Sequence, residues 1–205
     1  MRVEGVEQFD FQAIHVALQQ TGEGLFSRRG SLPVQANGAF VLSNVSAGDY
    51  RVDVQGLPGD CYLKSARLSG YDVLEAGITI TAGQGVGSLE LTLNPHGGHI
   101  QGAVVDENQQ PVQAATVVLI PDPPRRAETR LFVTATTDQY GRYTLRGITP
   151  GDYKCFSWKE VKPGAYQDPE FLKLYEDLGE PVSVKEGDQL NFQVELIPVG
   201  ANPSY

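Results

Sequence analysis

Short runs of alternating hydrophobic and polar residues, separated by turn residues, recur along the chain and predict β-strands. In the first half, the run Phe40–Leu42 is followed after a turn by the run Tyr50–Val54. In the second half, the same order occurs at Tyr143–Leu145 and Tyr153–Phe156. Each turn between the runs contains a glycine, which permits a positive φ. Each half therefore predicts a strand–turn–strand hairpin with one buried face.

The two hairpins are copies at a constant separation of 103 residues. Residues 48–50 and 151–153 both read Gly-Asp-Tyr, and Gly38 aligns with Gly141. At nearly the same separation, Ile80 aligns with Val184. A repeat of this length indicates two tandem modules. Proline and paired glycines at 94–98 suit a junction, so we place the domains at residues 1–95 and 96–205.

Further hydrophobic runs complete each module and indicate about seven short strands in it. An all-β fold of two tandem antiparallel β-sandwiches accommodates such a pattern. The first strand of the first module is cut short at Met1, so we expect more protein upstream in the natural chain. The runs lie at 2–6, 11–18 and 62–68 in the first module, and at 99–105, 114–120, 131–137, 182–184 and 190–196 in the second.

The second module also carries an insertion, residues 159–180, that holds the one helix we expect. Asp168 is placed to cap it and Pro169 suits its first position. Spacing of i, i+3, i+4 and i+7 gives it one apolar face, ended by Gly179. That face consists of Phe171, Leu174, Tyr175 and Leu178.

Aromatic residues gather in or beside this insertion, and they are our candidates for contact with a ligand or a partner. Exposed rings stack on sugars and anchor protein partners. The alternative is that the rings pack the insertion onto the sandwich. The candidates are Trp158, Tyr166, Phe171 and Tyr175.

The second module resembles a carboxypeptidase regulatory-like domain, whose fold is a transthyretin-like (prealbumin-like) β-sandwich related to the immunoglobulin type. Three runs carry the resemblance: residues 102–119, 136–145 and 147–153. It covers about 96–198, and residues 1–95 resemble the same family more weakly. The resemblance implies tandem modules of bacterial secreted or cell-surface proteins, used for scaffolding, spacing or adhesion. A related starch-binding-like fold implies carbohydrate recognition.

Composition and charge narrow the classes further. The 205 residues carry a net charge of −9, spread as −4 over residues 1–95 and −5 over 96–205. An acidic chain without a basic cluster does not suit nucleic acid, and no apolar run reaches the roughly 20 residues of a membrane span. Two cysteines, Cys61 and Cys155, cannot build a disulfide framework. Each fits a buried free thiol. The alternative is one disulfide bond between them, which requires their Cα atoms to lie close together.

No arrangement of residues indicates catalysis, a cofactor or a metal. His96 and His99 flank two glycines, and His15 is the only other histidine, which leaves a zinc site short of ligands. The acidic runs 106–108 and 186–188 fit turns better than calcium loops. Nucleophile-elbow and phosphate-loop motifs are absent. We expect no enzyme.

The sequence therefore predicts a non-catalytic module pair that serves as a structural spacer or adhesion segment of a larger surface protein. The expected location is extracellular or in the cell envelope, with a signal peptide upstream of Met1. Alternatives are a carbohydrate-binding module that uses the aromatic insertion, or a subunit of a surface filament or assembly. Expected partners are upstream domains of the same chain, and carbohydrate or other surface proteins.

Overall fold

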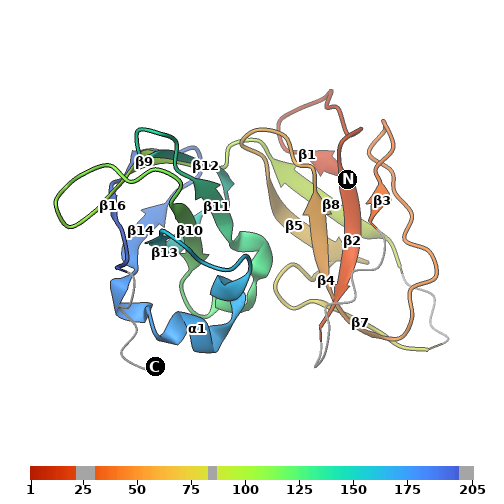
Figure 1. The fold of residues 1–205 in the computed structure, drawn as a ribbon. Coiled ribbons are helices and arrows are strands. Elements are labelled where there is room, and N and C mark those ends of the chain that lie inside the picture. The colour runs from red at the N-terminus through yellow and green to blue at the C-terminus, as the bar shows by residue number, and fades with distance from the viewer. Residues whose placement is uncertain (22–30, 83–86, 199–205) are drawn as a thin grey trace. The chain divides into compact units, whose positions relative to one another are not determined.

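The computed structural model describes residues 1–21, 31–82 and 87–198. The chain divides into two compact units, Met1–His96 and Gly97–Tyr205. Both consist of short strands, and the helical segments lie in the second unit (Figure 1). The predicted all-β sandwich class is confirmed.

The first unit contains two four-stranded sheets, ordered β3-β2-β4-β7 and β1-β8-β5-β6. All pairs are antiparallel except β1 with β8, which is parallel. The strands are β1 (Arg2–Val3), β2 (His15–Gln20), β3 (Leu32–Pro33), β4 (Gly48–Gln55), β5 (Tyr62–Leu68), β6 (Tyr71–Asp72), β7 (Ile78–Ile80) and β8 (Leu89–Asn94).

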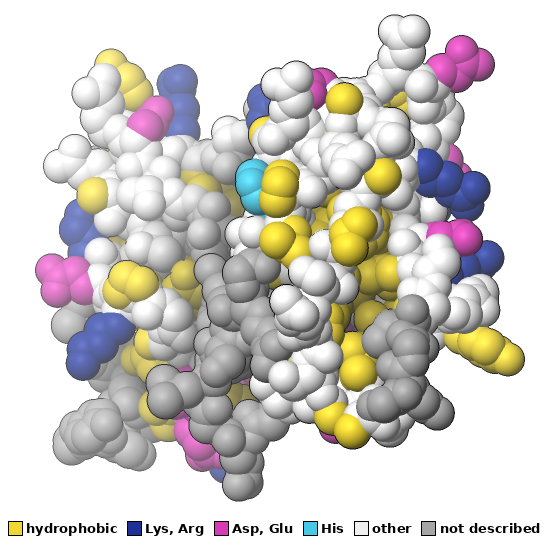
Figure 2. Space-filling model, turned by 90° about the vertical axis from the view of Figure 1, so that its right-hand side faces the viewer, with side chains coloured by type: hydrophobic (Ala, Val, Ile, Leu, Met, Phe, Trp, Pro, Cys, Tyr) yellow, Lys and Arg dark blue, Asp and Glu magenta, His cyan; other side chains and the backbone are white. Residues whose placement is uncertain are grey.

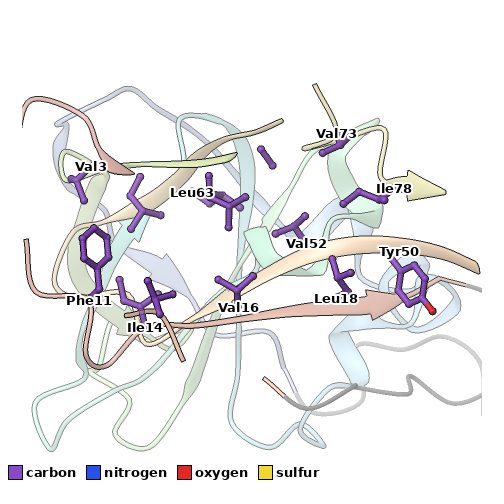
Figure 3. Packing of buried hydrophobic residues seen from close by; sticks show 14 of the residues in the cluster. Val3, Phe11, Ile14, Val16, Leu18, Tyr50, Val52, Leu63, Val73 and Ile78 are labelled. Carbon is purple, nitrogen blue, oxygen red and sulfur yellow. The ribbon is translucent and has the colours of Figure 1, made fainter. Parts of the chain in front are cut away.

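Alternate residues of these strands form the core of the first unit. Val16 and Leu18 of β2 lie on the same face as Val52 of β4, because side chains two apart in a strand share a face. They pack with Leu63 of β5, on the other sheet (Figure 3). The outer face of the same sheet is polar, and Asp53 of β4 lies there among half-buried neighbours. The alternation therefore gives a sheet with one buried face.

The second unit has the sheet order β11-β10-β13-β14 and a second sheet in which β9 lies between β12 and β15, with β16 also on β9. Its strands are β9 (Gly98–Val105), β10 (Thr116–Pro121), β11 (Val133–Thr136), β12 (Arg142–Ile148), β13 (Gly151–Trp158), β14 (Glu180–Val184), β15 (Gln189–Asn191) and β16 (Val194–Glu195). Its helical turns are η1 (Arg125–Ala127), η2 (Thr129–Leu131), η3 (Ala165–Gln167), α1 (Pro169–Lys173) and η4 (Glu176–Leu178).

The repeat in the sequence is also a repeat in geometry. The Tyr50 hydroxyl donates a hydrogen bond to the Ser46 carbonyl at 3.0 Å, and the Tyr153 hydroxyl donates to the Thr149 carbonyl at 2.6 Å. In both units a buried tyrosine therefore fastens the turn that precedes its own strand. The pairing partners also match, since Gly48 faces Ile80 and Gly151 faces Val184.

A positive φ recurs at the first turn residue of both hairpins. It is 56° at Asn44 and 65° at Gly147, one repeat apart. Glycine and asparagine are the residues that tolerate this left-handed conformation best. The left-handed backbone conformation of these turns therefore explains why asparagine or glycine stands at this position.

Two predicted features differ in the structure. Phe40–Leu42 is not a strand, although its counterpart Tyr143–Leu145 lies within β12. In the second unit that segment pairs with β9, and the described part of the first unit has no strand in the equivalent position. The sandwiches are also not purely antiparallel, since β15 and β16 both run parallel to β9.

Cys61 and Cys155 are free, buried thiols, one in each unit. Cys155 lies on β13 and faces the sandwich core with Tyr153. Burial raises the pKa of Cys155 to about 12 and, with the nearby charge of Asp60, raises that of Cys61. Both therefore act as small core residues and hold little reactive thiolate at neutral pH.

Candidate functional site: the aromatic insertion of the second unit

The sheet β11-β10-β13-β14 of the second unit is covered on both faces. Tyr153 and Cys155 of β13 face the core between the sheets, while Phe156 and Trp158 belong to a separate cluster. On β10, Val117 joins the first set and Val118 the second. A strand buried on both faces carries apolar residues at both odd and even positions, and residues 114–120 and 153–158 do so.

The inserted segment between β13 and β14 supplies the cover over the second of these faces. Leu172 of α1 is buried in the cluster, and the half-buried Phe171 and Tyr175 pack against it. The Trp158 ring stacks on Phe156 with centroids 5.4 Å apart and planes at 2°. It meets Phe171 at 5.9 Å and the edge of Tyr175 at 5.7 Å. The rings thus form one aromatic cluster between sheet and insertion.

The helix begins as predicted and ends sooner. Asp168 Oδ1 accepts a hydrogen bond from the Glu170 amide at 2.9 Å, and Pro169 is the first helical residue. The helix stops at Lys173 and continues only as the turn η4. The predicted apolar face is therefore wrong at Leu174 and Leu178, which are exposed. One turn of α-helix followed by a 3₁₀ turn rotates these two residues away from the sheet, and Leu172 takes the buried position.

The four candidate residues are thus placed in different surroundings. Trp158 is 4% exposed and its indole nitrogen is buried with no hydrogen-bond partner among the described residues. Phe171 and Tyr175 are half-buried against it. Tyr166 lies earlier in the insertion, is half-buried against the same cluster, and lines a pocket of about 300 Å³ with Thr116, Thr134 and Thr136. Ligand contact by these residues stays a prediction, while packing accounts for the position of Trp158.

An ion-pair cluster adjoins the aromatic one and holds the insertion by charge. The Glu176 carboxylate accepts hydrogen bonds from both Arg126 terminal nitrogens, one of them at 3.2 Å. Lys154 Nζ reaches the same carboxylate at 2.8 Å and the Glu176 carbonyl at 2.9 Å. Hydrogen bonding to Arg126 is the largest cause of a lowered pKa at Glu176. The partners of Glu176 lie 22 and 50 residues away in the sequence, so local spacing does not reveal this ion pair.

Replacing Glu176 with glutamine is expected to lower the free energy of unfolding by about 1 kcal/mol at pH 7. The carboxylate is about a third exposed, which limits the effect. Because its pKa is lowered in the folded chain, its contribution is full above the ordinary value of 4.5 and is lost as pH falls through the folded value. Urea unfolding of wild type and variant at several pH values checks this.

The matched control is Asp177→Asn, which removes a charge from the adjacent, exposed residue of the same turn. It should leave stability within about 0.5 kcal/mol of wild type. An unfolding difference for Glu176→Gln that stays constant from pH 7 to pH 3 contradicts the ion-pair role.

Among the described residues, no group of three or more His, Cys, Asp or Glu side chains could hold a metal ion. The described helices are all too short or too polar to cross a membrane.

A family model identifies the second sandwich. Residues 99–196 match the model of the carboxypeptidase regulatory-like domain. The second unit is a carboxypeptidase regulatory-like domain. This confirms the resemblance drawn from the sequence. The aromatic insertion lies inside the matched range, so it is a part of this carboxypeptidase regulatory-like domain and not an appended segment.

Solved structures give more distant likenesses. The chain is similar to GBS52, a minor pilin of Streptococcus agalactiae, with 13% identity and a TM-score of 0.33 over 96% of this chain and 88% of that one. It is similar to BcpA, the major pilin subunit of Bacillus cereus, with 11% identity and a TM-score of 0.32 over 74% of this chain and 65% of that one.

The chain is also similar to the Bacillus anthracis TIE protein, with 12% identity and a TM-score of 0.33 over 89% of this chain. It spans only 33% of the TIE protein's length. TM-scores this low do not bear on function. A comparison with curated proteins finds no match.

Proposed function

We propose that this chain is a pair of non-catalytic β-sandwich modules that act as a structural spacer or adhesion segment of a larger cell-surface protein. One observation carries the proposal: the tyrosine-anchored hairpin of the carboxypeptidase regulatory-like domain recurs in the first unit with the same hydrogen bond and the same strand partner. This recurrence supports the assignment of the first unit as a second module of the same kind. Repeated modules of this family serve scaffolding, spacing or adhesion.

The acidic surface suits an exposed location, because net charge far from zero keeps a protein soluble. The net charge of −9 is shared by both modules. The partners in this proposal are neighbouring domains of the same polypeptide and other proteins of the cell surface.

Antibody labelling of the source cells tests the location. Intact cells should be labelled as strongly as permeabilised ones, with a cytoplasmic protein as the control that needs permeabilisation. A strain whose gene lacks residues 1–205 should export the remaining protein and adhere less well. Labelling that requires permeabilisation contradicts the proposal.

A second candidate, carbohydrate binding, is favoured by one observation. Tyr166 borders a pocket with three threonines, and an aromatic ring beside hydroxyl groups suits a sugar. This candidate moves the predicted contact from Trp158, which is buried, to Tyr166.

If the Tyr166 pocket binds a sugar, Tyr166→Ala should weaken that binding about fivefold or more, because a ring-stacking contact is worth about 1 kcal/mol or more. Titration of the intact protein with a panel of oligosaccharides measures this. Tyr140→Ala is the control, since Tyr140 is 59% exposed and does not line the pocket. Failure of every oligosaccharide to bind at millimolar concentration rules this candidate out.

A further inference from the structure

The sheet of β12, β9 and β15 in the second unit has an outer face of polar and small side chains. Side chains two apart in a strand share a face, and Tyr143, Leu145, Ile100 and Leu190 point to the core. The residues that alternate with them are arginine or threonine on β12, histidine, glutamine or alanine on β9, and glutamine or asparagine on β15. These outward side chains include no carboxylate, although residues 96–205 carry a net charge of −5.

A depression of about 350 Å³ lies in this face. Two small, half-buried residues of the central strand, Gly102 and Ala103, lie in it. On the flanking strand β12, Arg142 is opposite Ala103 and Thr144 is opposite Gln101. Longer side chains therefore surround a stretch of β9 that has almost none. The other residues of the depression are Tyr143, Asn191 and Gln193.

The polar groups around the depression are suited to a ligand with both charge and hydroxyl groups. They are one guanidinium, three carboxamides and one hydroxyl. A carboxamide and a hydroxyl each donate and accept hydrogen bonds, whereas a guanidinium only donates and prefers an anion. All five side chains are exposed, so a ligand can reach them. They belong to Arg142, Gln101, Asn191, Gln193 and Thr144.

The guanidinium of Arg142 is oriented and has no anionic partner. It lies over the ring of Tyr140, 5.3 Å from the ring centroid. Stacking uses the flat face of the guanidinium and leaves its N–H edge for a carboxylate. Asp138 is nearby, but its Oδ1 accepts the backbone amides of Tyr140 and Arg142 at 2.8 and 2.9 Å. Within residues 1–21, 31–82 and 87–198, the Arg142 side chain forms no ion pair or hydrogen bond.

The first unit has a cavity of a different kind, an apolar groove of about 480 Å³. Leu18, Phe40 and Leu89 are among the residues that line it. Figure 2 faces this side of the first unit and shows hydrophobic side chains gathered in a hollow. Such a lining gives an anion no partner. The depression on β9 is therefore the better place for an anionic, hydrophilic ligand.

We infer that the depression on β9 binds a saccharide that carries a carboxylate, such as a hexuronic acid. The carboxylate pairs with the N–H edge of Arg142. The carboxamides of Gln101 and Asn191 and the hydroxyl of Thr144 exchange hydrogen bonds with the sugar hydroxyls. A volume of about 350 Å³ lies within the range of small-molecule sites. A protein partner fits less well, because the centre of a protein interface is apolar.

This site goes beyond the spacer or adhesion role and does not depend on it. It also differs from the Tyr166 pocket, which lies on the sheet β11-β10-β13-β14 and has no basic side chain in its lining. A neutral sugar gives Arg142 no charged partner. The charge of the probe therefore separates the two sites.

Titration of the intact protein with digalacturonate tests the inference. The matched probe is the neutral disaccharide of galactose with the same linkage, which has hydroxymethyl groups in place of the carboxylates. Amide chemical shifts of residues 101–103 and 142–144 should change saturably with digalacturonate. The neutral disaccharide should bind about tenfold more weakly or less, because it forms no charge-assisted hydrogen bond with Arg142.

Two arginine variants show whether the effect is local. Arg142→Gln should weaken digalacturonate binding about tenfold or more, because it removes the paired charge and keeps a polar side chain. Arg146→Gln is the matched control, since Arg146 is an exposed residue of the same strand outside the depression. It should change the affinity by less than about twofold, because exposed charges at a distance are screened by salt.

Three results would overturn the inference: no saturable shift with digalacturonate, equal affinity for the neutral disaccharide, or an equal loss of affinity in both arginine variants. Shifts confined to the residues around Tyr166 would also overturn it, because the sugar would then occupy the other sheet. A blocked Ser-Glu-Ser peptide that binds as tightly as digalacturonate would overturn the choice of a saccharide and indicate an acidic peptide instead.

Discussion

Replacing Trp158 with alanine is expected to lower the free energy of unfolding of the second unit by about 3–5 kcal/mol, the usual cost of removing a buried tryptophan. Trp158 is 4% exposed and contacts the rings of Phe156, Phe171 and Tyr175. The variant loses the ring that stacks on Phe156 of the sheet, and with it the surface on which the insertion packs. Urea unfolding followed by circular dichroism measures the change.

Trp158→Phe separates packing from hydrogen bonding. Because the indole nitrogen is buried with no hydrogen-bond partner in the described part of the chain, phenylalanine removes an unsatisfied donor and keeps a ring in the cluster. We expect it to cost less than about 1.5 kcal/mol. A cost for Trp158→Phe equal to that of alanine would show that the ring contacts are not what matters. Trp158 is the only tryptophan, so wild-type fluorescence reports on the second unit alone.

Gly102→Ala is expected to destabilise the second unit by about 3 kcal/mol, although it adds only one methyl group. Gly102 lies in β9 opposite Tyr143, and a Cβ there would overlap the carbonyl group of Phe192. That carbonyl also accepts a hydrogen bond from the Tyr143 hydroxyl at 2.6 Å. The methyl group must therefore displace backbone and weaken a partly buried hydrogen bond at once.

Chemical denaturation compared with Gln101→Ala checks this result. Gln101 is the adjacent, exposed residue of the same strand, and its replacement should change stability by less than about 0.5 kcal/mol. If Gly102→Ala is as stable as wild type, β9 does not approach Phe192 as closely as the structure indicates.

Much of the fold could be predicted because it depends on local patterns that occur twice. The Gly-Asp-Tyr runs at 48–50 and 151–153 marked two hairpins, and the residues around them identified the family. Buried Tyr50 and Tyr153 explain why these runs recur, since each hydroxyl donates a hydrogen bond to the turn residue four positions earlier. Local spacing is sufficient for such features.

What could not be predicted depends on partners distant in the sequence. Phe40–Leu42 has the alternation of a strand, but a strand needs a neighbour, and it pairs with no strand of the described sheets. The spacing of Leu174 and Leu178 assumed a longer helix than the sheet supports. The ion pair of Glu176 has no local signal in the sequence, because Arg126 lies 50 residues earlier.

For the candidate site, the sequence indicated where aromatic residues gather and left open whether they bind or pack. The signal that favours packing was present. Residues 114–120 and 153–158 are apolar at both odd and even positions, which indicates a sheet covered on both faces. The corresponding strand of the first unit has Arg51, Asp53 and Gln55 where the second unit has Lys154, Phe156 and Trp158.

The sheet that contains β10 and β13 is covered by side chains on both faces, whereas the sheet that contains β2 and β4 has a polar outer face. This difference affects how each unit unfolds. Amide hydrogens in β10 and β13 lie beneath a side-chain layer on each face, so they should exchange with solvent only when the whole second unit unfolds. The equivalent strands β2 and β4 have a polar outer face, and a groove opens the interior beside them. Their amides should exchange earlier, through smaller openings. Under mechanical load or proteolysis, the first unit would therefore yield first, and the second would remain folded longest.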